Sequence, residues 1–186
     1  MKINSINNIN FGKKAIFNCT VKRTNDNEKY QATLYSFDPK NPDDMDEIDT
    51  TMKDCPLKRN FTDGRNYYSK YFVLMTDKTN EIISAAQTSE HYSRIGKYEG
   101  RYTSVDEVEH NEDFIDPMTP TLSHIAKEAM DRFSKHIITA FRTYEAPSLK
   151  NSKFTQNKNE VWFLPERRYH ILIDTAEKRN QIDYIE

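Results

Sequence analysis

The chain has 186 residues, with 27 basic and 29 acidic side chains and a formal net charge of −2. Aromatic residues make up 12% of it, which is typical of a folded domain and not of a disordered chain. A chain without basic excess is not typical of nucleic-acid binders, and no stretch reaches the roughly 20 apolar residues of a membrane span. We therefore expect a cytoplasmic protein that binds neither nucleic acid nor membrane.

One domain is the simplest organisation for a chain of this length. The first residues are polar and rich in asparagine, without the apolar segment of a signal peptide. We expect a flexible leader over residues 1–14 and a single α+β domain over residues 15–186. Cys19 and Cys55 have no CxxC spacing and no neighbouring histidine, so we expect no metal site.

Two hairpins and a helix are predicted in the first half of the chain. Phe17, Cys19 and Val21 alternate with polar neighbours, which indicates the buried face of a strand. Asn41 is a preferred N-cap residue and Pro42 suits the first helical position, so a helix should begin there. The expected strands are Ala15–Arg23, Tyr30–Phe37, Tyr71–Asp77 and Glu81–Gln87, followed by a loop over His91–Gly100.

A long amphipathic helix is the strongest pattern in the second half. Thr119 suits the N-cap and Pro120 the first position, and apolar residues recur on one face as far as Phe133. We expect this helix to run from Pro120 to His136. The other expected elements are strands at Tyr102–Glu109, Ile137–Phe141, Glu160–Leu164 and Tyr169–Ile173, a short helix or turn within Glu145–Ser152, and a charged tail from Asp174 that forms a frayed helix.

The order of these elements resembles the GNAT N-acetyltransferase family over roughly residues 15–175. Tyr71–Gln87 looks like the family's central hairpin, and Tyr102–Phe133 like its fourth strand, connecting loop and third helix. Ile137–Phe154 looks like its fifth strand and the short helix that follows. The resemblance implies a single mixed, mostly antiparallel sheet flanked by helices. It also implies transfer of an acetyl group from acetyl-CoA to an amine of a small molecule or protein.

The segment that would hold the cofactor departs from the family pattern. In the family, a loop R/Q-x-x-G-x-G/A before the third helix cradles the pyrophosphate with backbone amides, and glycine permits the close approach. That hexad falls on Phe114–Thr119, which has no glycine and no arginine, while Asp116 adds negative charge and Pro117 lacks an N–H. The resemblance implies cofactor contacts at these positions: Val108, Thr119, Thr121, Leu122, Ser123, Ser148 and Asn151.

Acyl transfer to an amine needs a base for the ammonium and stabilisation of the developing oxyanion. Asp106, Glu107 and Glu109 are acids of the fourth strand, where the family often has its base. Glu107 and Glu109 share one strand face and are our candidates, although solvent-facing acids are also common at strand ends. Leu149 stands where the family often has a general-acid tyrosine, so Tyr144 is the candidate replacement. His124, in the first turn of the long helix, could contact an anion or act as a base.

Three functions fit these patterns. An active N-acyltransferase requires the sheet to splay near Val105 to Glu109 and leave a slot for the pantetheine arm. A GNAT-like protein without CoA binding would be a binding or regulatory module, with Phe114 or Met118 filling that slot. A different α+β fold with a protein-binding role would show a different strand order.

Overall fold

One sheet forms the centre of the protein. The computed structural model describes residues 13–38, 40–51, 69–94, 99–139, 146–156 and 161–185. Within these residues the sheet has the strand order β7-β8-β6-β5-β4-β3-β2-β1-β9. The strands are Lys14–Lys22 (β1), Lys29–Phe37 (β2), Ser69–Thr76 (β3), Ile82–Ser93 (β4), Gly100–His110 (β5), His136–Thr139 (β6), Thr155–Gln156 (β7), Trp162–Pro165 (β8) and Asp183–Tyr184 (β9). The helices are Pro42–Thr51 (α1), Thr119–Asp131 (α3), Ala146–Asn151 (α4) and Tyr169–Asn180 (α5), with a 3-10 turn at Glu166–Arg168 (η2).

The sheet is mixed, as the sequence predicts. β5 and β6 pair in parallel, from Tyr102 opposite His136 to Val105 opposite Thr139. The other strand pairs within the described residues are antiparallel. The parallel pair follows from the connection through α3, because parallel neighbours need a crossover. This strand order excludes the alternative of an unrelated α+β fold.

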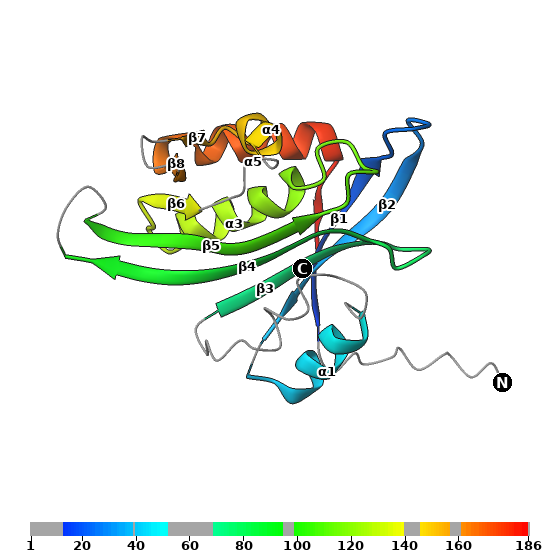
Figure 1. Ribbon diagram of the computed structural model, residues 1–186, viewed down its shortest axis with the longest axis horizontal. Coiled ribbons are helices and arrows are strands. Elements are labelled where there is room, and N and C mark those ends of the chain that lie inside the picture. The colour runs from blue at the N-terminus through cyan, green and yellow to red at the C-terminus, as the bar shows by residue number, and fades with distance from the viewer. Residues whose placement is uncertain are drawn as a thin grey trace.

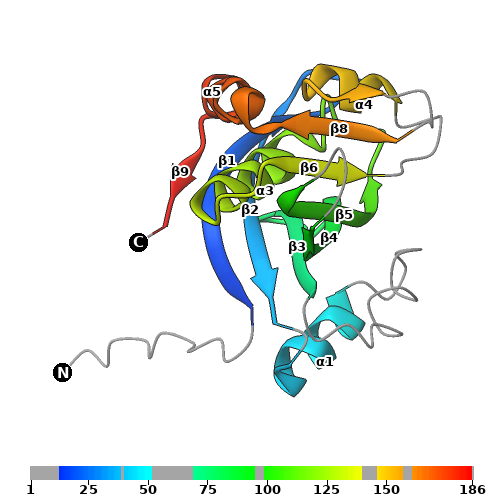
Figure 2. The ribbon, with the colours of Figure 1, turned by 90° about the vertical axis from the view of Figure 1, so that its left-hand side faces the viewer.

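The helices cover the two faces of the sheet unequally. Figure 1 shows α3, α4 and α5 on one face and α1 on the other, and Figure 2 shows the same layers from the side. The main core lies on the α3 face and includes Phe72, Leu74, Leu122 and Ile125. A smaller core lies on the opposite face and contains Phe37, Tyr71, Val73, Met75 and Ala85.

Both predicted hairpins are confirmed. β1 pairs with β2, and β3 with β4, in antiparallel register. Phe17, Cys19 and Val21 are buried, as their alternation indicates. The start of α1 is confirmed too, because the Asp43 amide donates to Asn41 Oδ1 at 3.1 Å. The leader over residues 1–14 stays a prediction, since residues 1–12 lie outside the described part.

The prediction of a final strand at Tyr169–Ile173 is wrong, because this segment begins helix α5. Its aromatic and β-branched composition resembles a strand. The side chains of Tyr169, Leu172, Ile173 and Ala176 are nevertheless buried at helical spacing. Tyr169, Leu172 and Ile173 belong to the same core as α3. The helix expected in the charged tail is confirmed, because α5 continues to Asn180; Asp183–Tyr184 then form β9, which pairs with β1 at the edge of the sheet.

Three boundaries differ from expectation. α3 ends at Asp131 and not at His136, because Phe133 has a left-handed φ of 57°. The amides of Phe133 and Ser134 donate to Met130 O and Ala129 O, which is a Schellman cap. The N-cap of α3 is Met118 in place of Thr119. β4 extends to Ser93 through the segment expected as a loop, because it continues to pair with β5.

Candidate functional site

The most distinctive feature of β5 is a bulge at Asp106. Within the described residues, the last β5–β6 pair is Val105 with Thr139, and β5 continues to His110. On the other side, Val105 pairs with Thr88 and Glu107 with Gln87, so Asp106 is an extra residue. Bulges of this kind re-aim side chains and are frequent beside active sites. The splay itself stays a prediction, because residues 140–145 lie outside the described part.

Asp106 is the strand acid whose surroundings the structure defines best. It is exposed, and its carboxylate accepts hydrogen bonds from Ser104 Oγ at 2.6 Å and from Ser89 Oγ. Glu109 is half-buried opposite Ala85 and has interactions of its own. The Glu107 side chain lies outside the described part, so its role as a base stays a prediction.

The hydrogen bonds of Asp106 continue to a histidine. Ser104 Oγ lies 2.8 Å from His91 Nε2, and the His91 ring stacks on Tyr102 with a centroid distance of 5.0 Å. We call Asp106, Ser89, Ser104 and His91 the Asp106 cluster. The sequence did not single out Ser89, Ser104 or His91, and the expected strand that ends at Gln87 left Ser89 and His91 outside a strand.

The Asp106 cluster lies on the face of the sheet opposite α3. Ser89 pairs with Ser69, two residues before Tyr71 of the smaller core, and cross-strand partners share a face. The Ser69 and Ser89 hydroxyls are 3.0 Å apart, which extends the polar network to β3. Burial and the nearby Asp106 carboxylate raise the pKa of Tyr71, so its phenol stays neutral beside the cluster.

The cluster presents a carboxylate in a fixed orientation, because two hydroxyl groups donate to Asp106. An exposed, oriented carboxylate is suited to holding an ammonium group through charge-assisted hydrogen bonds. His91 adds an exposed imidazole to the same cluster.

The residues expected to bind the cofactor on α3 are buried and bonded within the fold. The exposed fractions of Thr119, Thr121, Leu122 and Ser123 are 2%, 1%, 1% and 0%. Thr121 Oγ1 lies 2.7 Å from Ser84 Oγ, and Ser123 Oγ donates to Pro120 O at 2.7 Å. These side chains therefore join α3 to the sheet and do not line an open surface.

Val108 is also a core residue, with 6% of its surface exposed. Thr119 Oγ1 lies 3.4 Å from Ser152 Oγ, a weak contact that joins the start of α3 to the end of α4. Phe114 and Met118 are buried in the main core at 3% and 0% exposure. The loop before α3 is therefore packed against the body of the protein.

The backbone amides at the start of α3 are largely occupied. The Thr119 amide donates to Asp116 O at 3.1 Å and the Leu122 amide to Met118 O at 2.9 Å, while Pro120 has no N–H. Among the first four helical residues, only the backbone amide of Thr121 is left to donate a hydrogen bond to a bound phosphate. The family cradle depends on several such amides.

Asp116 occupies the left-handed conformation that glycine adopts most readily, with φ of 49°. Its carboxylate accepts from Asn151 Nδ2 at 2.8 Å and pairs with Arg179 at 3.1 Å. Asn151, expected near the pantetheine arm, thus holds the loop in place. The Ser148 side chain lies outside the described part.

The end of α4 has a left-handed residue at the position where the family motif has glycine. Lys153, at the family's glycine position, has φ of 68°. Its amide donates to Lys150 O and the amide of Phe154 to Leu149 O, as in a Schellman cap. Leu149, at the family's tyrosine position, is fully buried. Tyr144, the proposed replacement acid, lies outside the described residues and stays a prediction.

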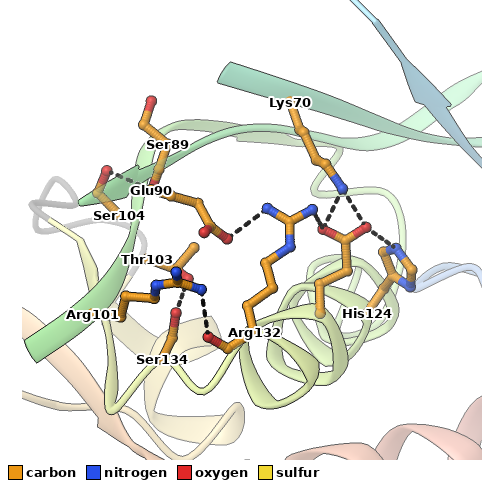
Figure 3. Close-up of polar contacts among 10 residues, drawn as sticks. Lys70, Ser89, Glu90, Arg101, Thr103, Ser104, His124, Arg132 and Ser134 are labelled. Carbon is orange, nitrogen blue, oxygen red and sulfur yellow. Dashed lines mark hydrogen bonds and ion pairs between the residues drawn. The ribbon is translucent and has the colours of Figure 1, made fainter. Parts of the chain in front are cut away.

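His124 belongs to a network that ties α3 to the sheet (Figure 3). Its ring packs against Phe72 at a centroid distance of 5.1 Å, and its Nε2 lies 3.6 Å from Glu128. Lys70 of β3 contacts both oxygens of Glu128, at 2.8 and 2.9 Å. Arg132 lies 3.5 Å from Glu128 and 2.6 Å from Glu90. At 7% exposure, His124 is placed for packing and not for solution chemistry.

The described residues hold no group of three or more histidine, cysteine, aspartate and glutamate side chains that could bind a metal ion. None of the described helices is long and apolar enough to cross a membrane.

Comparison with known proteins shows similarity at the level of the fold. No protein-family model and no curated protein matches the chain. A mutant of the AtaT toxin, solved with the C-terminus of the antitoxin AtaR and acetyl-CoA, has a TM-score of 0.51 and 8% identity, covering 77% of this chain and 98% of that one. A predicted acetyltransferase from Clostridium acetobutylicum, solved with acetyl-CoA, has a TM-score of 0.51 and 14% identity. The match covers 68% of this chain and 92% of that one. The expected GNAT-like fold is confirmed.

Proposed function

We propose that this protein is a GNAT-fold N-acyltransferase that moves an acyl group from acetyl-CoA or a related thioester to an amine. The observation that carries the proposal is the exposed Asp106 carboxylate, oriented by two serine hydroxyls at the bulge in β5. The similar fold of two acetyl-CoA complexes supports the proposal but does not specify an acceptor.

Asp106 would act first on the incoming amine. Its carboxylate accepts a hydrogen bond from the substrate ammonium and takes the proton, and the freed nitrogen attacks the thioester carbonyl carbon. The new C–N bond forms and the C–S bond breaks. As the tetrahedral intermediate collapses, the nitrogen gives its second proton to solvent, and the leaving thiolate takes a proton from solvent. Asp106 is exposed, so the proton that it took from the ammonium is also released to solvent.

Thiol release from acetyl-CoA tests this role, measured with the full chain and a panel of primary amines. Asp106→Asn keeps the size of the side chain and removes the base, so the rate should fall by about 100-fold or more. Asp113→Asn is the matched control, because Asp113 is also an exposed aspartate beyond the end of β5. An unchanged rate in Asp106→Asn contradicts the proposed base.

The packing at the start of α3 favours a second function, that of a binding protein without bound CoA. The buried hydroxyls, the occupied amides and Asp116 leave little of the family's phosphate cradle. A GNAT-fold protein without CoA binding would then use the Asp106 cluster to bind a cationic ligand or a protein partner.

Calorimetric titration with acetyl-CoA and with CoA separates the two functions. Micromolar binding supports the acyltransferase. No binding at millimolar concentration rules it out and leaves the binding protein. Bulky substitutions at Thr121 or Ser123 are unsuitable probes, because these buried side chains would disturb folding first.

A further inference from the structure

A basic pocket opens between the β1–β2 hairpin and the C-terminal end of α5. Figure 1 shows this end of α5 beside the hairpin. The cavity measures about 460 Å³, within the range of small-molecule sites. Its charged lining comprises Lys22, Lys29, Lys178, Arg179 and Asp116. Four cations thus face a single acid, although the whole chain has a slight excess of acidic residues.

The pairing of Lys22 with Lys29 is unfavourable without a ligand. These residues are directly opposite in the β1–β2 register, and both line the pocket. Like charges in directly opposed positions destabilise a sheet. Among the described residues, no acidic side chain forms an ion pair with Lys22, Lys29 or Lys178. A bound anion would remove this repulsion.

The helix dipole explains only two of the basic residues that line the pocket. Lys178 and Arg179 lie in the last turn of α5, where cations compensate the negative end of a helix. Lys22 and Lys29 come from strands and have no such role. Asp116 does not neutralise them, because its two oxygens already contact Asn151 and Arg179.

The walls of the pocket are held in place by hydrogen bonds. Asn180, which is 8% exposed, donates from Nδ2 to Thr20 O at 3.1 Å and fixes the end of α5 on β1. Gln181 ends the helix in a left-handed conformation, with φ of 51°. The lysines therefore project from a fixed frame, which lowers the cost of ordering them around a ligand.

We infer that this pocket binds a small molecule that carries two or more linked phosphates, with Lys22, Lys29 and Lys178 as the phosphate contacts. Lysine ammonium groups bind phosphate oxygens through charge-assisted hydrogen bonds. Both a free nucleotide and the phosphate end of a CoA thioester have this chemistry. The inference does not require the acyl-transfer reaction.

Calorimetry of the full chain with inorganic pyrophosphate, ADP and CoA tests the pocket. The double variant Lys22→Ala/Lys29→Ala should weaken pyrophosphate binding at least tenfold. Lys78→Ala, an exposed lysine in the β3–β4 turn, should leave it unchanged. Raising the salt concentration should weaken binding to the native chain.

The unliganded double variant should be at least as thermally stable as the native protein, because the opposed charges are gone. CoA binding that pyrophosphate displaces would identify a cofactor's phosphate end as the ligand class. Binding of pyrophosphate or ADP without CoA would identify free phosphate compounds. No binding at millimolar concentration, or equal binding by the double variant, overturns the inference. Asp106→Asn should bind pyrophosphate normally, which separates this test from that of acyl transfer.

Discussion

Replacing Glu128 by glutamine should lower the free energy of unfolding at neutral pH. This loss of stability should become smaller as the pH falls. Burial alone would raise the pKa of Glu128, but the adjacent His124 and Lys70 lower it from an ordinary 4.5 to about 2. At roughly 1.4 kcal/mol for each pKa unit, this difference corresponds to about 3 kcal/mol. Because the carboxylate is partly exposed, we expect about 1–2 kcal/mol after solvent screening.

The sign of the pH dependence follows from the lowered pKa of Glu128. Its folded pKa is below its unfolded pKa, so the stabilisation is complete above the unfolded value and is lost as the pH falls towards 2. Glu128→Gln cannot ionise and should not show this loss. The stability gap between the two proteins should therefore narrow to about half by pH 3.

Urea unfolding of both proteins between pH 7 and pH 3 measures this gap. Glu112→Gln is the control, because Glu112 is exposed at the end of β5 and its side chain has no ion pair within the described residues. Equal stability of Glu128→Gln and native protein at pH 7 would refute the reasoning. So would a gap that stays constant with pH, since it would indicate lost packing and not lost charge.

Three further outcomes are expected. Phe133→Gly should stabilise the protein by about 1 kcal/mol in urea unfolding, because Phe133 is 81% exposed and left-handed at the helix C-cap; a loss of stability would contradict this. Burial raises the pKa of the Cys19 thiol to about 12, so peptide mass spectrometry should find Cys19 unalkylated by iodoacetamide at pH 8 until the protein unfolds. Asp116→Gly should strengthen acetyl-CoA binding in calorimetry, because it removes a negative charge beside α3 and keeps the backbone conformation accessible; unchanged affinity would show that this loop is not near the phosphates.

The sequence predicts strand acids as the candidate base but does not point to Asp106. Simple alternation groups Glu107 with Glu109, whereas the contacts within the described residues define the surroundings of Asp106. Asp106 is selected by the bulge, which depends on its register against Gln87 and Thr88 of the neighbouring strand. A register shift has no signal in the strand's own residues, because it is set by packing across the sheet.

The sequence was limited in a similar way in predicting which side chains contact the cofactor. The sequence pattern correctly placed Thr121 and Ser123 near the start of α3, whereas Thr119, expected as its N-cap, is its first helical residue. It could not show that their hydroxyls face Ser84, Ser152 and their own backbone. Whether a polar side chain faces a ligand or the core depends on what packs over it.

The sequence by itself determined the hairpins, the start of α1 and the existence of α3, because alternation and capping act over a few neighbouring residues. Only the tertiary structure decided that Tyr169–Ile173 are helical, since burial against α3 overrides the strand-like composition of this first part of α5. The basic pocket has the same origin. Lys22 and Lys178 are far apart in the chain, and they line one cavity because Asn180 fixes the end of α5 on β1.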